Sequence, residues 1–128
     1  MDPETCDVLV VGAGPAGSTA AFILAGRGLR VALLDRCDFP RPKPCGGLLT
    51  RKTVQGLERI FRFGAAALAA AGLIRREARQ YTVAGLGAPP LTRRLDDPFY
   101  LIDRTTYDEF WLRRAVAAGA EFHPGTAV

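Results

Sequence analysis

Three glycines near the N-terminus have the spacing of a turn that can hold a phosphate group. They stand in the segment Gly12–Gly17, which reads GAGPAG. In such a turn the first glycine allows a sharp reversal, the second lets a pyrophosphate approach the backbone, and the third lets a helix pack closely. A helix that starts here also presents N–H groups and a partial positive charge. We therefore expect a phosphate site formed by Gly12, Ala13, Gly14, Pro15, Ala16 and Gly17.

An acidic residue follows this turn at the distance that ribose recognition requires. Asp35 stands at the end of the second apolar run, where a carboxylate about 20 residues beyond the turn binds ribose hydroxyls in dinucleotide-binding proteins. Arg36 comes next and is expected beside the adenine or in solvent. A glycine-rich turn alone arises by chance, but a turn between a strand and a helix, followed by this acid, predicts a dinucleotide site. These residues do not separate NAD from FAD.

The elements around the turn predict a Rossmann-type α/β fold. Asp7–Val11 is a short branched apolar run, which is typical of a strand inside a parallel sheet. Ser18–Gly28 has the small and apolar residues of a helix that ends in glycine, and Leu29–Asp35 those of a second buried strand. Together they predict one β-α-β unit over residues 7–35, followed by a proline-rich and glycine-rich loop over residues 36–48.

The rest of the chain alternates between predicted helices and strands. Helices are expected over Thr50–Arg62, Ala65–Ala71 and Arg104–Ala118. Strands are expected over Arg75–Leu86, Leu91–Leu95, Phe99–Ile102 and from Glu121 onward, with a turn at Gly87–Pro90.

The composition favours a globular protein and argues against several other classes. The 128 residues are 48% hydrophobic and 23% charged, which is enough apolar surface for a core. The net charge is +4, but the cations are scattered, so we expect no nucleic-acid partner. Cys6, Cys37 and Cys45 lack C-x-x-C spacing, which argues against a metal site and a disulfide framework and favours a cytoplasmic location. The longest apolar stretch, Phe63–Ile74, is shorter than the roughly 20 residues that span a bilayer.

A second motif lies in the loop that follows Asp35. This loop reads DRCDFPRPKPCGGLL and contains, in succession, Lys43, Pro44, Cys45, Gly46 and Gly47. These five residues resemble the Lys-Pro-Cys-Gly-Gly stretch of the geranylgeranyl reductase family of FAD-dependent oxidoreductases. The family's next marker, an arginine, an acid and a helix ending in Gly-Ala, is matched by Arg104, Asp108, Gly119 and Ala120. With three motifs in the same order, the resemblance extends over the whole chain.

The resemblance implies FAD as the cofactor, held by a domain of the glutathione-reductase type. It implies contacts with FAD from Gly12–Gly17, Asp35, Arg36 and Arg104. It also implies that Cys45–Gly47 lies near the flavin ring, where glycines allow close approach and N–H groups stabilise the negative charge of reduced flavin. Cys45 is either a weak catalytic candidate or, as we prefer, a packed thiol. Arg104 has an alternative partner in Asp108, one helical turn away.

The resemblance further implies a reaction, the reduction of carbon-carbon double bonds in geranylgeranyl groups, with NAD(P)H or another reductant as electron donor. A lipid substrate implies peripheral contact with a membrane, and the sequence identifies no protein partner. Three alternatives stay open: an FAD-dependent monooxygenase or halogenase, a quinone-linked dehydrogenase, and a non-catalytic dinucleotide-binding module. Because the family continues well past this length, we expect an N-terminal portion, incomplete at its C-terminus and inactive alone, in which residues from about 64 to 103 begin an inserted substrate-side segment.

Overall fold

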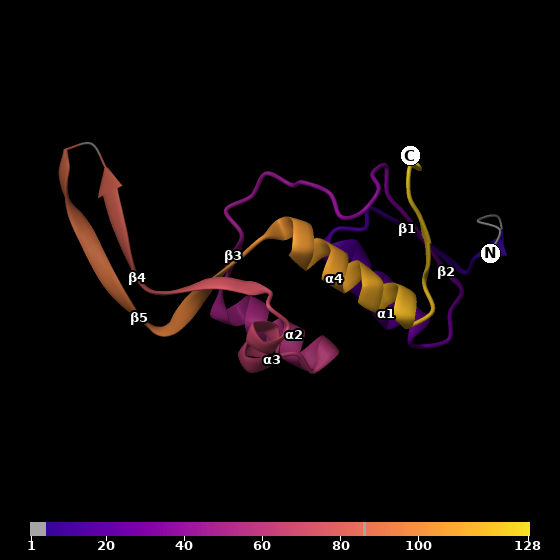
Figure 1. The fold of residues 1–128 in the computed structure, drawn as a ribbon, viewed down its shortest axis with the longest axis horizontal. Helices are drawn as coiled ribbons and strands as arrows, with labels where there is room; N and C mark the ends of the chain where they lie inside the picture. The colour runs from indigo at the N-terminus through magenta and orange to yellow at the C-terminus, as the bar shows by residue number, and fades with distance from the viewer. Residues whose placement is uncertain (1–4, 86) are drawn as a thin grey trace. The chain divides into compact units, whose positions relative to one another are not determined.

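The computed structural model describes residues 5–85 and 87–128, which form two compact units (Figure 1). The first unit contains the described residues up to Pro44 together with Arg104–Val128, and the second contains Cys45–Asp103. Each unit has its own sheet of three strands. No helix in the described part of the chain has the length and apolar character needed to cross a bilayer.

The first unit contains the predicted β-α-β arrangement. It is made of β1 (Val8–Val11), α1 (Pro15–Ala25), β2 (Val31–Leu34), α4 (Arg104–Ala117) and β6 (Glu121–His123). The strands are parallel in the order β1-β2-β6, with Val8 opposite Val31 and Ala32 opposite Glu121. The prediction of a Rossmann-type α/β fold is therefore confirmed.

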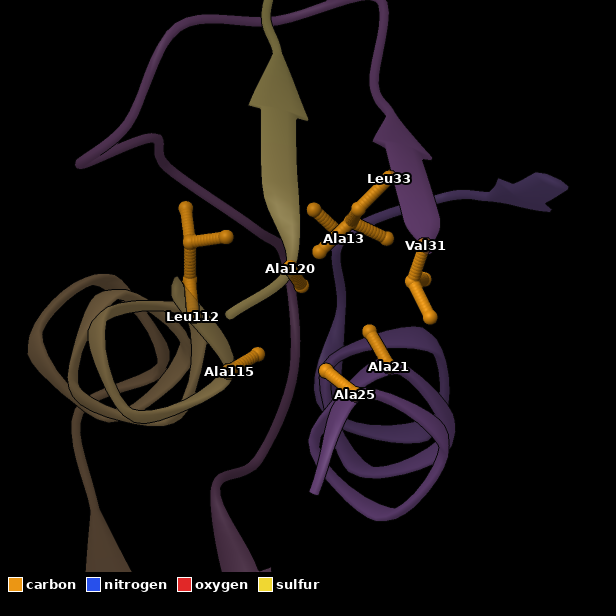
Figure 2. Packing of buried hydrophobic residues seen from close by; sticks show 8 residues of the cluster. All are labelled: Ala13, Ala21, Ala25, Val31, Leu33, Leu112, Ala115 and Ala120. Atoms are coloured by element: carbon orange, nitrogen blue, oxygen red, sulfur yellow. The ribbon is translucent and has the colours of Figure 1, made fainter. Parts of the chain in front are cut away.

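Alanines allow α1 and α4 to pack side by side against the sheet. Figure 2 shows Ala25 of α1 and Ala115 of α4 pointing toward each other, beside Val31 and Leu33 of β2. Val31, Leu33 and Ala115 are all 0% exposed, and full burial of a valine or leucine side chain contributes about 1.5–3 kcal/mol. Short side chains at the helix contact thus let two helices cover a narrow sheet closely.

Among the described strands, β1 lies at the edge of this sheet. Its apolar run was predicted to lie inside a sheet, and within the described residues Leu9 is 48% exposed and Val11 is 59% exposed. Val10 packs against the alanine-rich core, and its neighbours face the other way because side chains alternate along a strand. The same prediction is right for β2, whose four residues are all buried.

The second unit is an antiparallel sheet with two helices. It consists of β3 (Leu48–Leu49), α2 (Arg51–Phe61), α3 (Ala65–Ala70), β4 (Ile74–Gly85) and β5 (Ala88–Ile102), with strand order β3-β5-β4. Both helices lie within one residue of their predicted bounds at each end. The short strand β3 was expected to belong to a loop, and it pairs with β5 through Leu48 opposite Leu101.

The hairpin of β4 and β5 is longer than predicted. The two strands expected over Leu91–Leu95 and Phe99–Ile102 are one continuous strand, and Ala88–Pro90, expected as part of a turn, belong to it. The register shifts between the pairs Val83–Leu91 and Gly85–Ala88, so the prolines fall where the ladder is interrupted and no N–H is needed. Leu86, the last residue of the predicted first strand, lies outside the described residues.

Candidate cofactor site

The turn between β1 and α1 has the geometry that its glycines predict. Gly12 has a φ of +95°, a value that favours glycine. A Cβ atom on Gly17 would lie 1.7 Å from the carbonyl oxygen of Gly12 and 3.4 Å from Cγ1 of Val10, so only glycine lets α1 start this close to the turn. Gly14 has an ordinary φ of −70°. Its missing side chain therefore provides space beside the backbone and does not serve an unusual conformation.

The first turn of α1 presents donors suited to an anion. Pro15 stands at the first helical position, where its missing N–H costs nothing. No side chain caps this end of the helix, and within the described chain the N–H groups of Ala16 and Gly17 have no acceptor. These N–H groups lie at the positive end of the helix dipole, which is the arrangement that binds phosphate. The turn therefore fits a pyrophosphate.

Asp35 is buried beside the turn and holds it in shape. Its Oδ2 accepts a hydrogen bond from the N–H of Ala13 at 2.8 Å, and its Oδ1 accepts one from the N–H of Cys37 at 3.0 Å. The N–H of Ala13, predicted to contact the cofactor, thus donates to Asp35. Each carboxylate oxygen can accept a second hydrogen bond, so Asp35 retains the capacity to bind ribose hydroxyls.

A pocket of about 270 Å³ opens at the carboxyl edge of the parallel sheet. It is lined by Val11, Gly12, Asp35, Arg36 and residues 126–128. Nucleotides bind at this edge in open parallel sheets, so the pocket lies where the adenosine of a dinucleotide is expected. Sequence reasoning missed residues 126–128, although their position shortly after β6 was a usable signal, because the carboxyl ends of parallel strands share one edge.

Two arginines share the carboxylate of Asp108, whose side chain is fully buried. The guanidinium of Arg104 donates from Nε to Oδ1 at 2.6 Å and from Nη2 to Oδ2 at 2.8 Å. Nη2 of Arg41 lies 3.6 Å from the same Oδ2. The alternative partner of Arg104 is therefore present, while its contact with FAD stays a prediction. Arg41 was not predicted, because a single cation between two prolines carries no sequence signal.

The loop predicted over residues 36–48 is divided between the two units, and its segment Cys45–Gly47, predicted to lie near the flavin ring, belongs to the second unit. Cys45 is exposed, and its Sγ accepts a hydrogen bond from the N–H of Gly47 at 3.4 Å. Gly47 has a φ of +64°, and a Cβ there would come within 2.1 Å of the carbonyl oxygen of Ile102. Position 47 therefore requires glycine, because the Cβ of any other residue would collide with the carbonyl oxygen of Ile102. At Gly46 a Cβ would meet no described atom within 4 Å, which leaves space for a ring to approach. Lys43 and Pro44, just before this segment, are exposed.

Comparisons with known proteins agree with this arrangement. Residues 5–80 match the family model described as FAD binding domain. Geranylgeranyl diphosphate reductase of Rhodobacter capsulatus is 38% identical over 125 residues, which cover 94% of this chain and 28% of that protein.

Two solved structures share the fold and about a quarter to a third of the sequence. The myxobacterial chondrochloren halogenase CndH has a TM-score of 0.76 at 33% identity, covering 94% of this chain and 28% of that one. A geranylgeranyl bacteriochlorophyll reductase-like protein from Thermoplasma acidophilum has a TM-score of 0.75 at 26% identity, covering 94% of this chain and 30% of that one. The chain thus spans less than a third of the length of these relatives.

The family model covers more than half of the chain, and the turn that it contains fits a pyrophosphate. The chain therefore belongs to the FAD binding domain family, and its resemblance to the geranylgeranyl reductases is confirmed.

Proposed function

We propose that this chain binds FAD in an enzyme that reduces carbon-carbon double bonds of geranylgeranyl or related isoprenoid groups. The observation that carries the proposal is the 38% identity with geranylgeranyl diphosphate reductase along 94% of the chain. When bound, FAD supplies the hydride chemistry of such a reduction, and the protein supplies binding and orientation. NAD(P)H is the proposed source of electrons, and a lipid substrate brings the enzyme to a membrane surface.

Each part of the site has a separate role in this proposal. The N–H groups of Ala16 and Gly17 bind the pyrophosphate, and Gly14 leaves the space that the phosphates enter. Asp35 accepts hydrogen bonds from the ribose while it holds the turn. The Cys45–Gly47 segment lies against the flavin, with Gly46 offering the open approach.

A halogenase is the second candidate, because CndH is 33% identical over 94% of the chain. The two functions differ in what they consume. A reductase passes electrons from FAD to the substrate double bond, whereas a halogenase needs a halide and molecular oxygen. An FAD-binding domain is compatible with either reaction, so identifying the substrate that is converted distinguishes the two functions.

The deciding experiment uses a full-length enzyme that contains these residues. It is purified with FAD, reduced with NADPH under anaerobic conditions, and mixed with geranylgeranyl diphosphate. We expect reoxidation of the flavin with a gain of hydrogen in the product, measured by mass spectrometry. A parallel reaction contains air, chloride or bromide, and a phenol. A halogenated phenol, with no hydrogen added to the isoprenoid, would contradict the proposed reductase activity and support the halogenase activity instead.

The position of the cofactor is tested by Gly14→Val in the same protein. The branched side chain occupies the space assigned to the pyrophosphate, so FAD retention should be lost. The fold should persist, because the φ of Gly14 is ordinary and a Cβ there would lie 3.5 Å from Nη2 of Arg41, its nearest neighbour. Circular dichroism and the flavin absorbance are recorded together. Normal FAD content in a folded variant would show that the phosphates bind elsewhere.

The position of the flavin is tested by alkylation of the cysteines. Cys45 is exposed and should react quickly with iodoacetamide in the absence of cofactor. FAD is expected to slow its alkylation severalfold. Cys6 precedes β1, at the end of the sheet opposite the turn, and serves as the internal control that FAD leaves unchanged. Equal rates at Cys45 with and without FAD would contradict the placement of this segment beside the flavin.

A further inference from the structure

The guanidinium of Arg41 lies beside the phosphate turn, and no described residue accepts a hydrogen bond from it. Its Nη2 is 3.5 Å from the point that a Cβ on Gly14 would occupy. The side chain is only 14% exposed, yet the described residues offer it no hydrogen bond, and its ion pair with Asp108 is 3.6 Å long. A guanidinium has five N–H donors and strongly favours bidentate anions such as phosphate. Arg41 therefore has unused donors at the turn that fits a pyrophosphate.

The charges around Arg41 do not cancel. Asp108 contributes one negative charge, and it is shared by the two positive charges of Arg41 and Arg104. Arg104 takes both carboxylate oxygens in a bidentate pair, so the remaining positive charge resides on Arg41. This charge adds to the positive end of the α1 dipole at Gly14. The group formed by Arg41, Arg104 and Asp108 thus carries one net positive charge.

The side chain of Arg41 is held in this position from two directions. Its guanidinium lies over the ring of Phe39, 4.7 Å from the centroid, and Phe39 in turn packs edge-on against Phe122 of β6. Asp108 attracts the same guanidinium from α4. A long flexible side chain that is supported on a ring and drawn toward a buried carboxylate loses less freedom when it binds a ligand.

From this geometry we infer that Arg41 binds the pyrophosphate of FAD and that Asp108 is the positioning residue that holds Arg41 beside Gly14. The inference rests on the proposed placement of the pyrophosphate at the glycine turn. Asp108 touches no ligand in this arrangement, and its carboxylate would repel a phosphate. Its contribution to binding therefore comes through Arg41, whose donors it aims at the turn.

The test measures affinities for FAD, ADP and adenosine in the purified protein. Arg41→Gln removes the charge in an irregular loop and is expected to fold normally. It should weaken binding of FAD and ADP by about 10-fold to 100-fold, the range of one charge-assisted hydrogen bond. Adenosine lacks phosphate, so its affinity should not change. Arg41→Lys keeps the positive charge but loses the planar guanidinium. Its affinities for FAD and ADP should therefore lie between those of Arg41→Gln and the unmodified protein.

The sign of the effect at Asp108 separates positioning from simple electrostatics. Asp108→Asn removes a repulsive charge, so electrostatics alone would strengthen FAD binding, whereas loss of positioning would weaken it. We expect weaker binding of FAD and ADP, and a double variant with Arg41→Gln no weaker than Arg41→Gln alone. Glu109→Gln is the matched control, because Glu109 is the next residue on α4 and pairs with the exposed Arg113. It should leave all three affinities unchanged.

Several results would overturn the inference. Unchanged FAD and ADP affinities in Arg41→Gln would exclude Arg41 from the phosphate site. Tighter binding in Asp108→Asn, or a double variant weaker than either single one, would exclude positioning through Arg41. If Asp108→Asn does not fold, the two Arg41 variants still decide whether Arg41 binds the pyrophosphate. Loss of FAD in Gly14→Val together with normal binding in Arg41→Gln would refute this inference and leave the proposed function intact.

Discussion

Replacing Gly17 with alanine should distort the phosphate turn more than any other single methyl group in the first unit. The added Cβ would stand 1.7 Å from the carbonyl oxygen of Gly12, and real Cβ atoms essentially never come closer than 3.0 Å. The Cβ at position 17 and the Gly12 carbonyl must therefore move apart by about 1.3 Å, the difference between these two distances. The start of α1 cannot move freely, because α1 packs against α4 and β2 in a close-packed core.

Overpacking of this kind costs about 1–3 kcal/mol, and sometimes more. For a domain of this size each kcal/mol lowers Tm by roughly 4 °C, so Gly17→Ala should lower Tm by roughly 4–12 °C. FAD affinity should fall as well, because the N–H groups of Ala16 and Gly17 move with the helix. The assays are thermal unfolding followed by circular dichroism and FAD titration followed by flavin fluorescence.

Gly14→Ala is the matched control for this prediction. Gly14 lies in the same turn, but its φ is −70° and a Cβ there would have an ordinary contact at 3.5 Å. Its Tm should stay close to that of the unmodified protein, while its FAD affinity falls because the methyl group enters the phosphate space. If Gly17→Ala kept both the original Tm and the original FAD affinity, the close packing of helix on turn would not be what requires glycine here.

Three further predictions concern stability. Asp35→Asn leaves one acceptor oxygen for the N–H groups of Ala13 and Cys37, so thermal unfolding should show a loss of about 1–3 kcal/mol; an unchanged Tm would contradict the role of Asp35 in the turn. The side-chain hydrogen bond from Arg30 lowers the pKa of Asp7 from 3.8 to about 2, so this pair should stabilise the fold above about pH 4 and cease to do so as the pH falls toward 2. Asp7→Asn should remove the loss of stability that this pair causes on acidification, as measured by urea unfolding at several pH values. A variant whose stability varies with pH as in the unmodified protein would contradict the role of the pair. Gly56→Ala, in α2 with no described atom within 4 Å of the new methyl group, should raise stability by about 0.5–1 kcal/mol, and a lower Tm would show a hidden clash.

Local sequence signals were enough to predict the β-α-β unit and the glycine turn. The positive φ of Gly12 and the close packing at Gly17 follow from a motif whose members are neighbours in the chain. β1 lies at the edge of the three strands of its sheet in the described residues, and an apolar run by itself does not reveal the position of its strand in a sheet. β2 has the same kind of run and is fully buried.

The parts of the site that sequence missed depend on residues distant in the chain. Arg41 lies in a loop and Asp108 lies in α4, and no sequence signal in either segment indicates that the two residues interact. The prolines at 89 and 90 were interpreted as a turn, since proline usually ends a strand, and only the register of the hairpin shows that they fall at an interruption of the ladder. The structure was needed to bring such residues together.

The contact between Gly47 and Ile102 has a consequence for the order in which the second unit folds. The hairpin of β4 and β5 joins residues close in sequence and can form within about 1–10 μs. The N–H of Ile102 donates to the carbonyl of Gly47 at 2.8 Å, which, like the pairing of β3 with β5, requires the two ends of the unit to meet. Closing so long a segment is entropically costly, so this contact should form after the main folding barrier. Gly47→Ala is then expected to accelerate unfolding while leaving the folding rate nearly unchanged.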